Sequence, residues 1–242
     1  MTRKTVLITG AARRLGAAIV RDLHSHGMDI VLHYHSSEAE ATALAATLNE
    51  QRAGSVFPIR EDLLAVDFDA IAARATGFTG RLDVLINNAS AFYPTAVGET
   101  DAVQWEELVG TNLRAPYFLA QACVKALAEA QGCIINITDI HGEIPLKGYP
   151  VYSAAKAGLI MLTKALAKEL GPAIRVNAIS PGAVVWPESL AEPLRKKIIS
   201  RTLLKRQGTP GDIAGAVRYL IHDAGYMTGQ VLTVDGGRTL HS

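Results

Sequence analysis

The sequence lacks the features that mark secreted and metal-binding proteins. It holds only two cysteines, Cys123 and Cys133, which form neither a CxxC pair nor a disulfide pattern. Two reduced thiols are the expected state, and they indicate a cytoplasmic protein. The seven histidines include no HExxH motif and no cluster with cysteine. His33 and His35 would share one strand face, but without a third ligand we predict no metal site.

An excess of one charge and a long hydrophobic run are also missing. Lys and Arg total 24 against 23 Asp and Glu, and no block of like charges occurs. We therefore expect neither a nucleic-acid partner nor an anionic membrane surface. The longest apolar stretch, residues 159–170, is interrupted by Lys164 and Lys168 and predicts a helix of a soluble protein, not a membrane span. An apolar strand starts near residue 5, which leaves no room for a signal peptide before it.

The remaining sequence has the pattern of an α/β protein. Apolar residues make up 49% of the chain, enough for one large core at this length. Short β-branched runs, typical of a parallel sheet covered on both faces, alternate with segments of helical period. The predicted strands are residues 6–8, 30–33, 56–59, 84–86, 134–137, 175–179 and 231–234, and the predicted helices are residues 15–25, 38–51, 68–75, 102–130, 151–170 and 211–221. We predict one Rossmann-like domain over residues 1–242, with a doubly wound, parallel, seven-stranded sheet flanked by helices.

Two segments near the C-terminal end carry further local signals. Thr209, Pro210 and Asp212 suit the N-cap, N1 and N3 positions of the last predicted helix. Residues 183–207 are too long and too mixed in composition for a simple connection. Because connections of that length in compact domains are usually functional, we predict a substrate lid there.

A glycine-containing turn joins the first predicted strand to the first predicted helix. It runs from Gly10 to Gly16 and includes Arg13, Arg14 and Leu15. Glycine lets a backbone approach phosphates closely, and the N-terminus of a helix offers free N–H groups and a positive dipole. The two arginines add positive charge beside the turn. Although the spacing is not GxGxxG, the turn predicts a dinucleotide site.

The end of the second predicted strand indicates which dinucleotide binds. NAD-specific sites place an Asp or Glu there, on the ribose 2′-hydroxyl. This chain has no carboxylate before Glu38, and the preceding residues are His33, Tyr34, His35, Ser36 and Ser37. Nothing in that run repels a 2′-phosphate, while serine, histidine and the nearby Arg13 offer hydrogen-bond donors. We therefore predict NADPH as the cofactor.

Three residues form a candidate catalytic group. Tyr152 and Lys156 are spaced i and i+4, which places them on one face of a helix. Asp139 follows the apolar strand predicted at 134–137, at the edge where open α/β sheets bind ligands. Lys156 would lower the pKa of the Tyr152 phenol and Asp139 would raise it, and the sequence leaves open which effect dominates. Taken in isolation, Asp139 also suits a turn or a helix cap.

With these residues in view, the chain resembles the short-chain dehydrogenase/reductases over essentially its whole length. The shared marks occur in the family's order: the turn from Gly10 to Gly16, Asp62 with Leu63, Asn88 with Ala89, Asn112, Tyr152 with Lys156, and Pro181 with Gly182. The resemblance implies that Asp62 binds the adenine amino group and that Asn88 and Ala89 line the cofactor cleft. It also implies that Lys156 holds the nicotinamide ribose, supported by Asn112 through a water. A homotetramer is implied as well.

Three departures from the general family pattern resemble its pteridine reductase branch. Arg14 replaces the second loop glycine, Ser90 follows the Asn-Asn-Ala run, and Asp139 stands at the usual catalytic serine. This resemblance implies that Phe92 stacks on a pterin held against the nicotinamide. It further implies that Ser90 and Arg14 contact both pterin and cofactor phosphate, and that Asp139 with Tyr152 supplies the proton.

We therefore predict NADPH-dependent reduction of a pterin such as dihydrobiopterin or biopterin, with dihydrofolate as a further substrate to test. One alternative is a reductase of a 3-oxoacyl thioester or another carbonyl, although the Asp139 carboxylate would repel a developing oxyanion. A second is a dihydromonapterin reductase, which differs only in the side chain on the pterin. A non-catalytic sensor of the dinucleotide is a third, and the intact Tyr152–Lys156 pair disfavours it.

Overall fold

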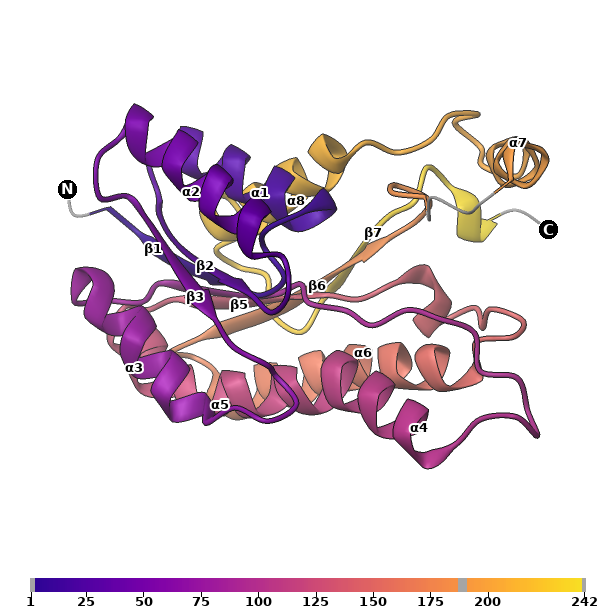
Figure 1. The fold of residues 1–242 in the computed structure, drawn as a ribbon, viewed down its shortest axis with the longest axis horizontal. Coiled ribbons are helices and arrows are strands. Elements are labelled where there is room, and N and C mark those ends of the chain that lie inside the picture. Colours follow the sequence, from indigo (N-terminus) through magenta and orange to yellow (C-terminus); the bar gives the residue numbers. More distant parts are fainter. Residues whose placement is uncertain (1–2, 187–190, 241–242) are drawn as a thin grey trace.

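The computed structural model describes residues 3–186 and 191–240. One sheet of seven parallel strands runs through the molecule in the order β3-β2-β1-β4-β5-β6-β7 (Figure 1). The strands are β1 (Thr5–Ile8), β2 (Asp29–Tyr34), β3 (Val56–Arg60), β4 (Val84–Asn87), β5 (Cys133–Ile137), β6 (Arg175–Pro181) and β7 (Val231–Val234). Each predicted strand coincides with an observed one or lies inside it, so the doubly wound, seven-stranded Rossmann-like sheet is confirmed.

Helices cover both faces of the sheet (Figure 1). One face carries α1 (Arg14–Ser25), α2 (Glu38–Gln51) and α8 (Pro210–His222), and the other carries α3 (Phe68–Thr79), α5 (Ala115–Glu129) and α6 (Pro150–Leu170). The cores beneath the two layers take alternate strand residues: Val6 and Ile8 pack on the α1 side and Leu7 on the α5 side. Because both faces are covered, the inner strands are apolar without alternation.

The start of α8 follows the predicted capping pattern. The Thr209 hydroxyl accepts a hydrogen bond of 3.2 Å from the N–H of Asp212, and an Asp212 carboxylate oxygen accepts one of 2.7 Å from the N–H of Thr209. Pro210 occupies the first helical position, where its missing N–H has no consequence. This prediction is confirmed.

The single helix predicted over residues 102–130 is wrong in detail. The segment divides into α4 (Ala102–Val109), the π-helix η1 (Gly110–Arg114) and α5. Pro116 has no N–H to direct at the carbonyl of Asn112, so regular α-helical bonding cannot continue through this point. Single π turns of this kind occur frequently at functional sites. Helical periodicity alone does not reveal such a local widening.

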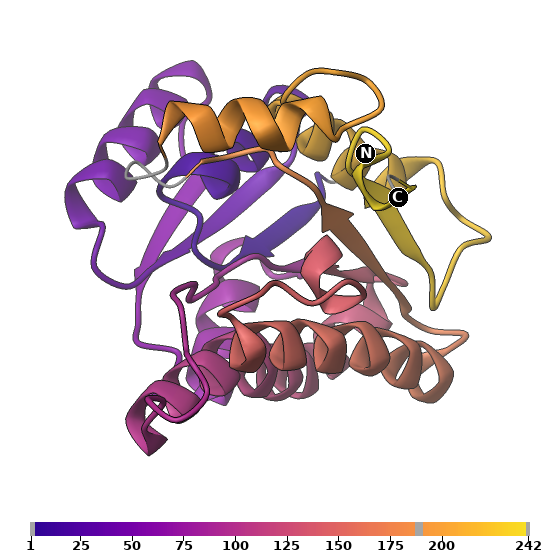
Figure 2. The ribbon, with the colours of Figure 1, turned by 90° about the vertical axis from the view of Figure 1, so that its right-hand side faces the viewer.

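The predicted lid, residues 183–207, contains an unpredicted helix, α7 (Glu192–Ser200). None of its residues is buried, so no apolar stripe in the sequence marks it. Residues 187–190 of the predicted lid lie outside the described residues. In Figure 2, α7 lies on one side of the carboxyl edge of the sheet and α6 on the other. Across the described ranges, no helix is both long and apolar enough to span a membrane.

Candidate active site

A cleft of about 570 Å³ opens along the carboxyl edge of the sheet. All but one of the residues that the sequence assigns to catalysis, cofactor or substrate line this cleft. They are Gly10, Arg13, Arg14, Leu15, Gly16, His33, Tyr34, His35, Ser37, Asp62, Leu63, Asn88, Ala89, Ser90, Asp139, Tyr152, Lys156, Pro181 and Gly182. The exception is Phe92. The topology thus gathers residues from across the chain into one site.

The glycine turn after β1 packs tightly against the end of β4. Gly10 has φ +61°, and a Cβ placed there would lie 2.9 Å from the Cα of Ala89, so only glycine fits. The Asn88 side-chain amide donates to the carbonyls of Thr9 at 2.8 Å and Gly10 at 3.0 Å. The N-cap of α1, Arg13, makes no side-chain capping bond. The first N–H groups of α1 therefore keep their capacity to bind an anion.

Arg14 occupies the left-handed backbone region, with φ +53°. This conformation costs a non-glycine residue roughly 1–2 kcal/mol, which explains why glycine is the usual residue there in the family it resembles. Its guanidinium Nη2 donates to the carbonyl of Trp186 at 3.0 Å, which joins the turn to the start of the predicted lid. A non-glycine residue in this conformation at the cleft is consistent with a function for its side chain.

Polar groups gather at the ends of β2 and β3. The exposed Arg13 guanidinium lies 3.5 Å from a carboxylate oxygen of Glu40 in α2. His35 Nε2 lies 3.9 Å from Asp62, whose other carboxylate oxygen accepts a bond of 2.9 Å from the N–H of Leu64. His33 is buried, and both of its ring nitrogens bond to the protein backbone. A donor from His33 to a 2′-phosphate, as the sequence predicts, would need one of those bonds to break.

The three candidate catalytic residues come together at the end of β5. The Tyr152 hydroxyl donates to Oδ2 of Asp139 at 2.8 Å, and the backbone N–H of His141 donates to Oδ1 at 2.8 Å. Asp139 therefore caps the short helix η2 (Ile140–Gly142) and contacts Tyr152 as well, so both interpretations of this residue hold. The Lys156 ammonium donates to the carbonyl of Ile137 at 3.0 Å and lies 5.8 Å from the Tyr152 ring centre.

Burial decides the protonation of this group. Desolvation raises the pKa of Tyr152 well above its ordinary value, and the charge of Asp139 and its hydrogen bond raise it further. Desolvation also lowers the pKa of Lys156 to about 8, opposed by the charge of Asp139. Of the two directions that the sequence left open for Tyr152, the upward one prevails. The phenol is therefore protonated at neutral pH and is a proton donor.

Ser90 and Asn112 are linked by a bond that the sequence did not reveal. The Ser90 hydroxyl donates to the side-chain oxygen of Asn112 at 2.7 Å. The amide of Asn112 donates to the carbonyls of Ala91 and Leu108, each at 2.9 Å. The Asn112 side chain, buried in the π-helix η1, thereby holds the segment after β4 in place.

Phe92 stands beside the cleft, where it is 42% exposed. Its ring stacks on Tyr149, with centres 4.7 Å apart and planes at 13°, and meets Tyr152 edge to face at 4.8 Å. Tyr149 is a residue that sequence reasoning missed, as are the cleft-lining Glu107 and Thr111. Only the proximity of Tyr149 to Tyr152 in the sequence hinted at its position. In the described parts of the chain, no group of three or more His, Cys, Asp or Glu is placed to hold a metal ion.

Comparison with known proteins indicates the family to which this chain belongs. Residues 10–239 match the family described as enoyl-(acyl carrier protein) reductase. Pteridine reductase 1 of Leishmania tarentolae is 35% identical, with 99% of this chain and 97% of that protein covered. The 3-oxoacyl-(acyl-carrier-protein) reductase of Synechocystis is 34% identical over 99% of this chain and 98% of its own length. The 3beta-hydroxysteroid dehydrogenase 1 of Eggerthella lenta is 33% identical over 98% of this chain and 94% of its own length.

Proposed function

The chain belongs to the short-chain dehydrogenase/reductase family of oxidoreductases, and on that premise we propose that it is an NADPH-dependent pterin reductase. The similar relatives act on different substrates by name, at nearly equal identity. The substrate assignment therefore rests on residues of the site itself. The observation that carries it is the carboxylate of Asp139, hydrogen-bonded to the Tyr152 hydroxyl.

The residues of the cleft fit a nicotinamide dinucleotide. Close packing at Gly10 and the uncapped start of α1 make a cradle for a pyrophosphate. Arg13 and Arg14 line the same cleft and supply positive charge. Lys156 lines the same cleft, and by resemblance it would hold the nicotinamide ribose. When bound, the cofactor would supply a hydride to a ring carbon of the substrate.

Reduction of a ring C=N bond also requires a proton on nitrogen, and Tyr152 would deliver it. A phenolate 2.8 Å from an ionised Asp139 is strongly disfavoured, since each negative charge opposes the other. We infer that Tyr152 gives its proton to the ring nitrogen and regains one from solvent by way of Asp139, so that no phenolate is left beside the carboxylate. Asp139 is only partly buried, so it can take that proton from solvent.

The same carboxylate disfavours carbonyl reduction. A carbonyl reductase stabilises negative charge that develops on the substrate oxygen, and neutral or positive donors do this best. Asp139 would instead place a negative charge beside that oxygen. Phe92 supports the pterin assignment, because it presents a partly exposed aromatic ring next to Tyr152 on which a flat heterocycle can stack.

Oxidation of NADPH by the purified protein tests the proposal. We expect turnover with dihydrobiopterin or dihydrofolate and little with an acetoacetyl thioester. Dihydromonapterin, assayed in parallel, measures how far the pterin side chain matters. Turnover of the thioester alone would contradict the pterin assignment and would favour an oxoacyl reductase.

We also propose a cytoplasmic homotetramer. The helices that cover the second face of the sheet, together with α4, leave large apolar side chains partly exposed; they are Trp105, Tyr117, Phe118 and Met161. Exposed large apolar side chains on neighbouring helices favour association. Both cysteines are buried and free, which suits a reducing compartment. Light scattering after size exclusion should give the mass of four chains, and a monomer would contradict the tetramer.

A further inference from the structure

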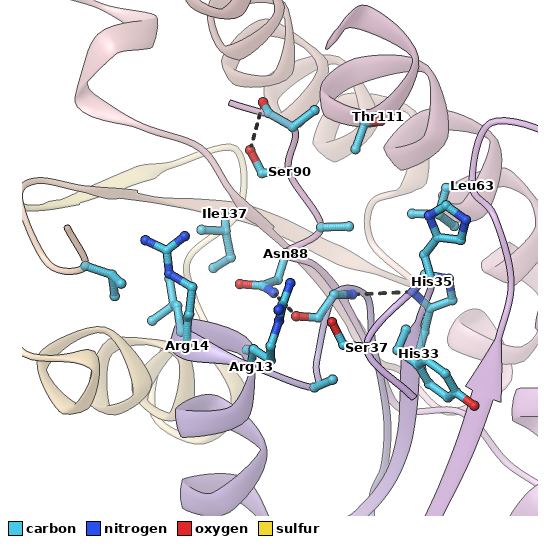
Figure 3. A pocket seen from close by; sticks show the side chains of 18 of the residues that line it. Arg13, Arg14, His33, His35, Ser37, Leu63, Asn88, Ser90, Thr111 and Ile137 are labelled. Carbon is cyan, nitrogen blue, oxygen red and sulfur yellow. Dashed lines mark hydrogen bonds between the residues drawn. The ribbon is translucent and has the colours of Figure 1, made fainter. Parts of the chain in front are cut away.

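His33, at the carboxyl end of β2, joins two segments that border the cofactor cleft. The residue is buried, with 2% of its surface exposed. Nδ1 accepts a hydrogen bond of 3.3 Å from the N–H of Gly10, in the turn after β1 (Figure 3). Nε2 lies 3.1 Å from the carbonyl of Glu61, just after β3. The backbone contributes as well, because the His33 carbonyl accepts a bond of 2.9 Å from the N–H of Ala11.

These contacts require a neutral imidazole in one tautomer. Nδ1 must offer its lone pair to the Gly10 N–H, so the ring proton lies on Nε2 and is donated to Glu61. In a protonated ring, the Nδ1–H group would face the N–H of Gly10, and two donors cannot form a hydrogen bond. Burial lowers the pKa of His33 to about 4, which keeps the ring neutral at physiological pH. A neutral, fully bonded ring supplies neither charge nor a free donor to a phosphate.

We infer that His33 is a positioning residue that holds the glycine turn at Gly10 in place against the Glu61–Asp62 segment. It is not a ligand of the cofactor 2′-phosphate. The inference rests on the proposed binding of a nicotinamide dinucleotide. These contacts of His33 position the glycine turn, which would bind the part of the dinucleotide that NADPH and NADH share. Discrimination between the two is left to the more exposed Arg13, His35 and Ser37.

Two substitutions separate positioning from direct contact. Asn at position 33 places a side-chain oxygen near the site of Nδ1 and keeps an acceptor for Gly10, whereas Leu keeps the bulk and removes both polar atoms. The dissociation constants of NADPH and NADH would be measured without substrate, by quenching of protein fluorescence or by calorimetry. Thermal melting would be recorded for each variant.

We expect His33→Leu to weaken both cofactors by about tenfold, because the Gly10 N–H loses its buried acceptor. His33→Asn should retain binding of both to within about threefold of the wild type. The ratio of the two dissociation constants should be unchanged in each variant. If His33→Leu does not fold, the ratio in His33→Asn still decides, since loss of a phosphate contact would change it.

A selective loss of NADPH affinity in either variant would overturn the inference and make His33 a phosphate ligand. Wild-type affinity for both cofactors in His33→Leu, with only a lower melting temperature, would also overturn it. Failure of the wild type to bind either dinucleotide would instead remove the proposed function and this inference together. Failure on pterins alone leaves the binding comparison intact.

Discussion

The hydroxyl of Tyr152 and the carboxylate of Asp139 are joined by a hydrogen bond of 2.8 Å. The carboxylate cannot turn away freely, because its other oxygen is held by the N–H of His141. Lys156 lies one helical turn beyond Tyr152 and bonds to the carbonyl of Ile137, two residues before Asp139. The protonation of Tyr152 and of Lys156 therefore depends in part on the charge of Asp139.

Substitution of Tyr152 by Phe should lower kcat by about 10²–10⁴-fold, the usual contribution of a positioned general acid. The substitution removes only the hydroxyl that donates the proton to the substrate, so the dissociation constant of NADPH should change little. Lys156→Met is the matched comparison and should impair both turnover and NADPH binding. Steady-state kinetics and direct titration of the cofactor measure the two effects. Near-normal kcat in Tyr152→Phe would remove the tyrosine from the mechanism.

Asp139→Ala should nearly abolish pterin reduction while the fold and NADPH affinity persist. Without the carboxylate, Tyr152 has no partner to replace the proton it gives up. Asp139→Ser restores the hydroxyl usual in the family that the sequence resembles, and should not rescue pterin turnover. NADPH oxidation with dihydrobiopterin compares the wild type with both variants. Full activity in Asp139→Ser would make the carboxylate incidental and would weaken the case for a pterin substrate.

The alkaline limb of kcat/KM should report Lys156. Because burial lowers the pKa of this lysine to about 8, its ammonium is present below that pH and is lost above it. We therefore expect kcat/KM to fall as pH rises through about 8, since this ratio reports ionisations of the free enzyme. In Lys156→Arg the side chain keeps its positive charge to higher pH. The alkaline limb of the residual activity should therefore move to higher pH. An unchanged limb in that variant would assign the ionisation to another group.

NADPH should be used in preference to NADH, and Glu40 should influence the strength of that preference. Arg13 is the cation that the sequence predicts to bind the 2′-phosphate, and its guanidinium lies 3.5 Å from Glu40. Arg13→Ala should reduce the NADPH preference by about tenfold or more, the effect of one charge-assisted bond. Glu40→Gln removes the competing carboxylate and should increase the preference, by no more than about fivefold because the pair is exposed.

The ratio of kcat/KM for the two cofactors measures these effects. Arg60→Ala is a suitable control, because it breaks a comparable exposed pair with Glu38 in the same helix. It should leave the ratio unchanged. Equal kcat/KM for NADPH and NADH in the wild type would contradict the interpretation of the carboxylate-free turn after β2.

Much of this molecule follows from local sequence. Short apolar runs separated by helical segments determine a parallel sheet, because such strands must be covered on both faces. The spacing of Tyr152 and Lys156 places them on one helix face, and the position of Asp139 at the end of β5 brings it to the same edge. The single helix predicted over residues 102–130 was wrong, because Pro116 interrupts the regular backbone hydrogen bonding. The spacing of apolar residues does not reveal such a local interruption.

Only the tertiary structure decided how the site residues are bonded and charged. The sequence makes His33 a plausible phosphate donor, yet contacts with Gly10 and Glu61, far away along the chain, occupy both of its nitrogens. The upward direction of the Tyr152 pKa likewise depends on burial and on the distance to Asp139. Local sequence determines backbone conformation through side-chain sterics and apolar spacing. Solvation and hydrogen bonding are determined by atoms that only the folded chain brings within reach.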